Sequence, residues 1–198
     1  MRLTREQAAR NREAIVETAA RVFRARGIDG VGLADLMKEA GFTHGGFYNH
    51  FESKEALAAE ACGAAFARAV GGLRAVLEAA GPEAGRLLAD TLQGYLSPAH
   101  RDAGDGGCPT AAMVSDAARQ GEPVQAAFAD GIEGYLALLA GTFAAGSPDA
   151  AVRTAARERA VSVLSGIIGA LVLSRAVARA NPALSDEILA VGRRRLSD

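Results

Sequence analysis

The sequence predicts an all-α protein. Apolar residues recur three and four positions apart along most of the chain, as in Leu33, Leu36, Met37 and Ala40. Glycine, proline and asparagine separate these periodic stretches, where they are expected to end one helix and begin the next. Alanine and glycine are abundant, only 5% of the residues are aromatic and Trp is absent, which favours closely packed helices over a sandwich or barrel. With 49% apolar residues among 198, the chain has enough for a substantial core.

The N-terminal part shows two helices joined by a turn. Thr4 to Gln7 form a capping-box pattern, and the first helix is predicted over about 4–26. Gly27 ends it, a turn follows, and a second helix runs to about residue 40 and turns sharply at Gly41. Gly32 is a weak cap for this second helix.

The stretch from Gly41 to Lys54 organises the rest. It has the pattern of a tight turn, a very short helix and a second turn that opens a long helix, which together make a helix-turn-helix. Thr43 is expected to cap the short helix through its hydroxyl group, and Phe42, Phe47 and Phe51 are expected to point at the preceding helices.

The polar side chains of the short helix then face outward, where hydroxyl, imidazole and amide groups suit a DNA groove. The alternative is a surface helix whose polar residues are simply solvated. Ser53 should cap the next helix, with Lys54 in its first turn beside a phosphate. The predicted DNA-binding residues are Thr43, His44, Gly46, Tyr48, Asn49, His50 and Lys54.

The stretch from Gly41 to Leu57 resembles the DNA-binding signature of the tetracycline-repressor (TetR) family. The resemblance implies a homodimeric, all-helical transcriptional repressor that binds operator DNA and is released from it by a small ligand in its C-terminal domain. In the family, Thr or Ser is common where this chain has Gly32, and a small side chain that touches a base is common where it has Gly46. The resemblance also makes the helix from about residue 54 to 80 a connector. We therefore expect a DNA-binding domain at 1–56 and a helical regulatory and dimerisation domain at 57–198.

Charge is distributed unevenly along the chain. The net charge is −1, yet arginines outnumber acidic residues in the first 26 residues. A basic end on a neutral body fits a protein that docks DNA with one end, and the alternative is a solvated charged helix.

The sequence indicates a cytoplasmic protein. Cys62 and Cys108 are far apart and no secretory leader precedes them, which points to a reducing compartment. The uncharged apolar stretch between Arg159 and Arg175 is shorter than the roughly 20 residues that a membrane-spanning helix needs. No membrane span is expected.

The C-terminal part is predicted to hold five further helices and one loop. The helices are expected at about 82–97, 110–119, 121–143, 148–180 and 182–195, the loop at 98–107, and Gly146, Ser147 and Pro148 are expected to end one helix and cap the next.

The last two helices are the predicted dimer interface, as a four-helix bundle across a two-fold axis. The helix that ends near residue 180 is apolar nearly all round, and its glycines allow a second helix to approach closely. The alternative is that these residues form the core of a single chain. The predicted interface residues are Val161, Leu164, Ile168, Leu171 and Ile188.

A ligand pocket is expected among the helices between Cys62 and Phe143, although the same large side chains equally describe a core. They are Phe66, Leu92, Tyr95, Leu96, Met113, Phe128, Ile132 and Tyr135. Cys108, just before Pro109, is expected at a helix N-cap, where the helix dipole favours a thiolate. It is either a thiol sensor or a small residue packed under a loop, and Cys62 is expected in the core.

An enzyme is not expected. Cys108, His100 and Asp102 form a conceivable triad, but His100 and Asp102 lie in a glycine-rich stretch with nothing evident to orient them. No nucleotide-loop or metalloprotease spacing occurs, and no metal or cofactor is predicted. The alternative to a DNA-binding regulator is a helical dimer that binds protein partners without DNA.

Overall fold

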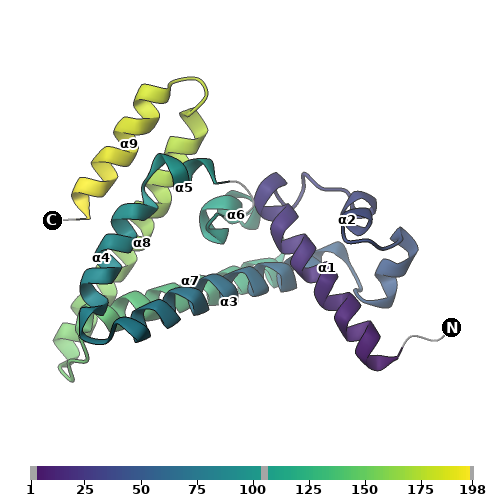
Figure 1. Ribbon diagram of the computed structural model, residues 1–198, viewed down its shortest axis with the longest axis horizontal. Helices are drawn as coiled ribbons and strands as arrows, with labels where there is room; N and C mark the ends of the chain where they lie inside the picture. Colours follow the sequence, from purple (N-terminus) through teal and green to yellow (C-terminus); the bar gives the residue numbers. More distant parts are fainter. Residues whose placement is uncertain (1–3, 104–106, 197–198) are drawn as a thin grey trace. The chain divides into compact units, whose positions relative to one another are not determined.

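The chain is all-helical, as predicted. The structure is a computed structural model that describes residues 4–103 and 107–196, and no strand occurs among them (Figure 1). The helices are α1 (Arg5–Arg26), α2 (Leu33–Glu39), the 3-10 helix η1 (His44–Asn49), α3 (Lys54–Ala80), the 3-10 helix η2 (Gly81–Glu83), α4 (Ala84–Tyr95), α5 (Pro98–Asp102), α6 (Pro109–Ala117), α7 (Glu122–Ala144), α8 (Ala150–Val177) and α9 (Pro182–Arg195).

The residues group into two compact units. The first unit holds the described residues up to Arg68 together with 107–131, and the second holds Ala69–Ala103 and the described residues from Ile132 onward. Both α3 and α7 run through the two units without a break. The contact boundary in α3 therefore falls later than the expected domain boundary near residue 56, and the functional division at 56/57 stays a prediction.

The core of the first unit is built by α1, α2, η1 and the start of α3. Residues of α1 at positions 15, 16, 19, 20, 22 and 23 are buried, as its apolar spacing predicts. The three elements that follow also contribute fully buried side chains, namely Leu36 and Met37 of α2, Phe47 of η1 and Leu57 of α3. Thr4 caps α1 by accepting a hydrogen bond from the Gln7 N–H, which confirms the predicted start.

The second unit contains α4, α5, α8 and α9, and α8 and α9 lie side by side (Figure 1). Ser174 and Ser185 are both fully buried, and each hydroxyl donates to the other residue's backbone carbonyl. These reciprocal bonds join the two helices. Asn181 caps α9 through Leu184, as expected for an Asn-Pro start.

Two predicted boundaries were wrong. The stretch 98–107 was expected to be a loop, but 98–102 form α5, because Ser97 caps it by accepting from the His100 N–H and Pro98 occupies its first position; residues 104–106 lie outside the described residues. Helix α8 is capped by Asp149, two positions after Ser147, since the Asp149 carboxylate accepts from the Ala151 N–H.

Two helical stretches, Lys54–Tyr95 and Ala150–Val177, are long and apolar enough to cross a membrane by length and composition alone. The uncharged stretch between Arg159 and Arg175 is shorter than α8, because α8 includes charged residues as well. Core helices of soluble proteins satisfy the same two criteria. Only 28% of the most apolar window of α8 is buried, so much of this helix remains exposed.

Candidate nucleic-acid interface

A glycine turn positions the short helix after α2. Gly41 has a φ of +83°, its N–H donates to the Lys38 carbonyl at 3.1 Å, and the Phe42 N–H donates to the Met37 carbonyl at 2.8 Å. This pair of bonds is a Schellman motif, which ends a helix with a left-handed residue and favours glycine there. The turn predicted at Gly41 is confirmed, and its direction is fixed by the backbone.

The recognition segment η1 is a 3-10 helix. The Gly46 N–H bonds the Thr43 carbonyl, and the Thr43 hydroxyl makes no capping bond. Thr43 therefore stands at the predicted N-cap position, but the prediction that its hydroxyl caps the helix was wrong, because the main chain already satisfies this N–H.

One aromatic side chain anchors η1 to the core formed by α1, α2, η1 and the start of α3, which we call the head. Phe47 is fully buried and its ring stacks on Phe51 at 5.5 Å between centroids, while Phe42 is half-buried. Burying Phe47 forces its neighbour in sequence to face away from the core. Tyr48 is consequently 65% exposed, with its ring edge-on to Phe47.

The predicted contact residues in η1 gather on its exposed side. Thr43, His44, Tyr48 and Asn49 are exposed, and the His44 and Tyr48 rings lie edge to face at 6.4 Å. His50 is half-buried. A Cβ at Gly46 would lie 3.4 Å from the Thr43 hydroxyl, at the lower limit of ordinary van der Waals contact.

Lys54 lies at the first position of α3, next to the recognition segment. Ser53 caps α3 by accepting from the Ala56 N–H at 3.0 Å, as predicted. The Lys54 ammonium donates to the Ile28 carbonyl at 2.6 Å. One of the three N–H donors of the ammonium is thus used inside the protein, and the other two can still bond a phosphate, as predicted.

Arg12 supports the recognition segment from α1, a role that sequence reasoning missed. Its Nε donates to the His50 carbonyl at 3.4 Å, its guanidinium lies 4.5 Å from the Phe51 ring centroid, and it forms an ion pair with Glu60. The residue therefore joins three elements of the head. No local pattern marks it, because all three contacts are with residues far along the chain.

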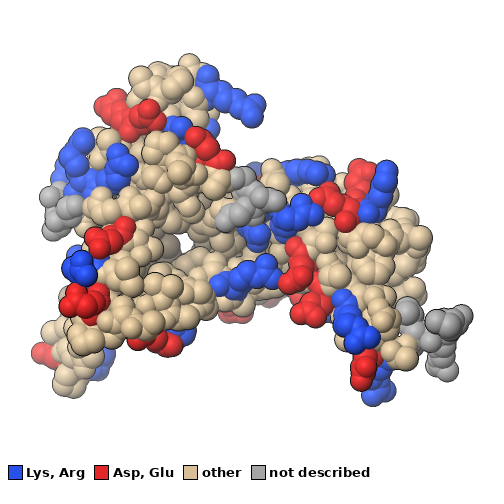
Figure 2. All heavy atoms as spheres, viewed as in Figure 1, with Lys and Arg blue, Asp and Glu red and all other residues tan. Residues whose placement is uncertain are grey.

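The basic N-terminal end is partly neutralised by acidic partners. Arg21 and Arg26 both pair with Glu39, at 2.8 and 3.3 Å, and Arg10 lies 3.9 Å from Glu6. Figure 2 shows basic and acidic side chains interspersed over the face in view. The charge available to a phosphate backbone is therefore smaller than the arginine count of α1 indicates.

The eight expected pocket residues divide between the two units. Phe66, Met113 and Phe128 are buried in the first, where Phe66 meets Phe128 edge-on at 5.0 Å and packs closely on Gly131. In the second unit the remaining residues are buried or half-buried: Leu92, Tyr95, Leu96, Ile132 and Tyr135. The pocket stays a prediction.

The two cysteines differ in environment. Cys62 is buried, and burial raises the pKa of its thiol to about 12, which fits the expected core role. Cys108 stands at the N-cap of α6, as predicted, and is half-buried.

The conceivable catalytic triad is not assembled. Asp102 accepts hydrogen bonds from Arg101, at 2.8 and 3.1 Å, so its partner is an arginine and not a histidine. The His100 ring lies 4.3 Å from that of Tyr95, and burial, followed by the charge of Arg175, lowers the pKa of His100. Among the described residues no group of His, Cys, Asp or Glu could hold a metal ion.

The predicted interface residues separate into buried and accessible ones. Leu164 and Leu171 are buried within the second unit and so are unavailable to a partner, while Val161 is exposed and Ile168 and Ile188 are half-buried. Between α8 and α9 lies an apolar hollow of about 480 Å³. It is lined by Ser165, Gly166, Gly169, Ala170, Leu173, Leu184, Glu187, Ile188, Val191 and Gly192.

A recognition segment held by a glycine turn, followed by a long helix and a second helical unit, defines an all-helical helix-turn-helix protein. The family model described as "Bacterial regulatory proteins, tetR family" matches residues 15–61, which include α2 and η1. Residues 15–61 of the chain are thus similar to the DNA-binding part of this family of regulatory proteins.

Relatives match somewhat more than a quarter of the chain. The HTH-type transcriptional regulator TtgR of Pseudomonas putida is 42% identical over 57 residues, which are 29% of this chain and 27% of TtgR. The HTH-type transcriptional repressor BepR of Brucella suis biovar 1 is 44% identical over 54 residues, 27% of this chain and 26% of BepR. The chain thus spans about a quarter of the length of the curated relatives it matches.

Solved structures resemble the chain along almost its whole length. E. coli NemR in its reduced form has a TM-score of 0.75 at 22% identity, with 94% of this chain and 95% of NemR covered. A TetR family transcriptional regulator from Cytophaga hutchinsonii has a TM-score of 0.68 at 25% identity, with 100% and 97% covered. The fold beyond the helix-turn-helix is therefore similar to that of these two proteins.

Proposed function

We propose that the chain is a DNA-binding transcriptional regulator, acting as a repressor, and that η1 is the element that reads its operator. The observation that supports this proposal most directly is the contrast between two neighbouring residues of η1. Phe47 is fully buried, whereas Tyr48 is 65% exposed. A rigidly anchored segment that presents hydroxyl, imidazole and amide groups can bond phosphates and base edges. The match to the tetR family over residues 15–61 supports the same role.

The proposed contacts are those of the exposed side of η1 and of Lys54. Exposed Thr43, His44, Tyr48 and Asn49 are positioned for the groove, and Gly46 keeps the backbone accessible. Lys54 and His50 are assigned to the phosphate backbone. A cation bonded to a protein carbonyl is held in place, and this reduces the entropy lost when it meets a phosphate.

We infer that the protein acts as a homodimer through α8 and α9. Leu173 is 60% exposed, and Val161, Leu184 and Val191 are exposed too, although all are apolar. A Cβ at Gly166 or Gly169 would meet no atom within 4 Å, so the backbone of α8 is open to a close helix. A two-fold interface brings the same surface of two copies together, so this exposed apolar face would pack against its counterpart, and half-sites along a duplex require such symmetry.

Release from DNA is proposed to follow binding of a small ligand or modification of Cys108. The half-buried thiol stands at the N-cap of α6, and α6 reaches the head through Asp116, which bonds the Ile28 N–H at 3.0 Å. The similar structure of E. coli NemR is that of its reduced form, which is a reason to test a thiol signal here. We place the regulator in the cytoplasm, where thiols are kept reduced.

The experiment is protection mapping of the DNA that flanks the gene, with the full chain and with Tyr48→Ala. We expect a protected site with two-fold symmetry, weakened in Tyr48→Ala and retained in Val76→Ala, which changes an exposed residue of α3. Affinity should fall as salt rises, because phosphate contacts release counterions. If no fragment is protected at any salt concentration, a helical dimer that binds protein partners becomes the better description.

Mild oxidation is the second arm of this experiment. Protection that is lost on oxidation in the wild type and kept in Cys108→Ser assigns the signal to Cys108. Loss in both proteins removes the thiol from the proposal and leaves a small ligand as the signal.

A further inference from the structure

Three arginines line a hollow of about 400 Å³ in the second unit. Its walls come from α5, α8 and the residues that follow α8, namely Arg101, Asp102, Arg175, Ala176, Ala178 and Arg179. All of them lie within a single compact unit. The hollow is separate from the apolar one between α8 and α9, with which it shares no lining residue.

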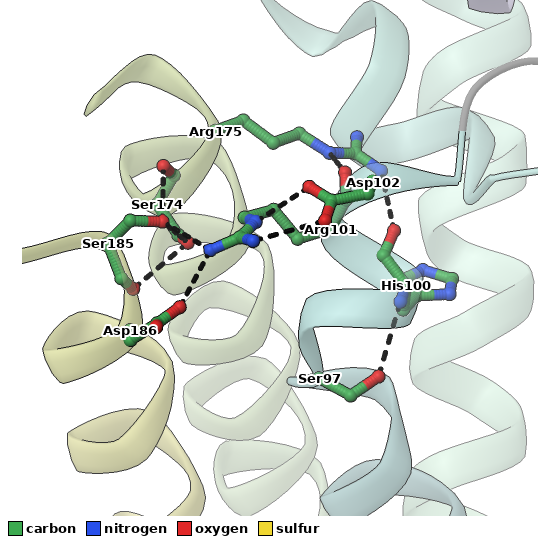
Figure 3. A network of polar contacts seen from close by, with 8 residues as sticks. All are labelled: Ser97, His100, Arg101, Asp102, Ser174, Arg175, Ser185 and Asp186. Carbon is green, nitrogen blue, oxygen red and sulfur yellow. Dashed lines mark hydrogen bonds and ion pairs between the residues drawn. The ribbon is translucent and has the colours of Figure 1, made fainter. Parts of the chain in front are cut away.

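Arg101 is paired with two carboxylates inside the protein (Figure 3). Its guanidinium bonds both carboxylate oxygens of Asp102, the Ser185 hydroxyl at 2.8 Å and Asp186 at 2.8 Å, and its side chain is only 13% exposed. Hydrogen bonding from Arg101 lowers the pKa of Asp102, so this carboxylate stays ionised. Arg101 is therefore a fixed wall of the hollow, and together with its two carboxylate partners it carries a net charge of −1.

Arg175 donates its hydrogen bonds to backbone carbonyls, and its charge also helps to lower the pKa of Asp102 without a direct bond. Its Nε donates to the Arg101 carbonyl at 2.9 Å and its Nη2 donates to the His100 carbonyl at 3.1 Å (Figure 3). These bonds hold the guanidinium plane against the end of α5 and leave Nη1 without an acceptor in the part of the chain that the structure describes. The positive charge is thus oriented but not neutralised by a bonded carboxylate.

Arg179 follows four residues later and lines the same hollow. It is exposed, and within residues 4–103 and 107–196 no carboxylate lies within 4.0 Å of either Arg175 or Arg179. The two positive charges of Arg175 and Arg179 exceed the sum of two negative contributions, the net −1 of Arg101 with its two carboxylates and the roughly half-electron charge at the C-terminal end of α8. A surplus of positive charge therefore remains at the hollow.

We propose that this hollow binds a small oxyanion, the carboxylate or phosphate group of a low-molecular-weight ligand. A guanidinium presents parallel N–H donors that match both groups, and Arg175 is already held in one orientation. The volume fits a small ligand. Bound there, the oxyanion joins α5 to the end of α8. That such a ligand is an effector rests on the proposed function, whereas its binding does not.

The test is a titration of the full ¹⁵N-labelled chain, without DNA, followed through the Arg Nε–Hε signals in NMR spectra. Inorganic phosphate and benzoate are the two probes, and benzamide is the neutral analogue of benzoate. We expect saturable shifts of the Arg175 and Arg179 signals with at least one anion and none with benzamide. The anion that binds more tightly identifies whether phosphate or carboxylate is preferred. Saturation with neither anion, or an equal response to benzamide, overturns the proposal.

Arg179→Ala and Arg194→Ala are the matched variants, because both arginines are exposed and only Arg179 lines the hollow. We expect Arg179→Ala to weaken anion binding about tenfold, as loss of a charge-assisted hydrogen bond does, and Arg194→Ala to leave it unchanged. Arg175→Lys keeps the positive charge but loses the parallel N–H donors of the guanidinium, and it should weaken anion binding as well. Equal effects of the Arg179 and Arg194 changes would show general charge screening and overturn the site. DNA binding is measured in separate samples, so failure of the regulator proposal leaves this result standing.

Discussion

The carboxylate of Asp116 accepts a hydrogen bond from the backbone N–H of Ile28, with Oδ2 and N 3.0 Å apart. The carbonyl of Ile28 accepts from the Lys54 ammonium at 2.6 Å. Ile28 is 1% exposed and belongs to the turn after α1. One buried residue is thus held by α6 from one side and by the first residue of α3 from the other, so a displacement of α6 acts directly on the head.

Replacing Asp116 with Ala should destabilise the protein. The Ile28 N–H would remain buried without an acceptor, which costs about 1–3 kcal/mol. Urea unfolding followed by circular dichroism measures the loss. Asp116→Asn keeps an acceptor oxygen in place and is expected to lose less. Equal stability of Asp116→Ala and wild type would mean that water replaces the carboxylate.

Gly41→Ala should destabilise the protein through backbone strain alone. Gly41 has a φ of +83°, and a Cβ there would meet no atom within 4 Å. The left-handed conformation costs a residue with a side chain roughly 1–2 kcal/mol. Gly45→Ala is the matched control, since a Cβ at Gly45 meets no atom either and its φ lies outside the left-handed region. Thermal unfolding of both variants separates strain from crowding, and a Gly45→Ala loss as large as that of Gly41→Ala would contradict this reason.

Phe47 and Tyr48 should separate stability from DNA binding. Phe47→Ala removes a fully buried ring and is expected to lose about 3–5 kcal/mol of stability. Tyr48→Ala removes an exposed ring and should change stability by less than about 0.5 kcal/mol. Its DNA affinity in fluorescence anisotropy should nevertheless fall about tenfold or more, as expected for a lost bond to a phosphate. A Tyr48→Ala protein with wild-type affinity would remove Tyr48 from the interface.

His100 should make stability depend on pH. Burial, and then the positive charge of Arg175, lower its pKa from the ordinary value of 6.5, so the folded state binds the proton less readily than the unfolded state. The unfolded chain therefore gains protons first as the pH falls below 6.5, and the stabilisation present above that pH is lost. Chemical unfolding at about pH 7.5 and about pH 5.5, on either side of this value, should show a smaller pH effect in His100→Gln than in wild type. Equal pH effects would assign the dependence to other groups.

Leu173→Glu should shift the dimer towards monomer. The substitution places a charge at a 60% exposed apolar position of the hollow between α8 and α9, and burying that charge against a second copy is unfavourable. Light scattering coupled to size exclusion measures the mass. Val152→Glu alters an exposed valine of α8 that does not line the hollow, and this variant should remain dimeric. A wild type that is monomeric at micromolar concentration would contradict the proposed interface.

Much of the head could be predicted from local sequence. Thr4, Gly41, Ser53 and Asn181 were assigned as helix-ending or helix-starting residues, and the structure confirms each, because a cap or a left-handed turn depends on only a few neighbouring residues. Burial of Phe47 beside an exposed Tyr48 followed from helical spacing in the same way. These features are local, and the sequence contains their causes.

The all-helical class, the helix-turn-helix and its outward polar face follow from the order of the amino acids alone. Only the tertiary structure shows that Lys54 bonds Ile28 and that Arg12 supports the recognition segment. It also shows that Leu164 and Leu171 are internal, and that Arg101 bonds two carboxylates while Arg175 bonds none. The physical reason is distance along the chain. Helical periodicity tells which residues share a face, but which elements meet that face depends on packing between segments far apart in sequence.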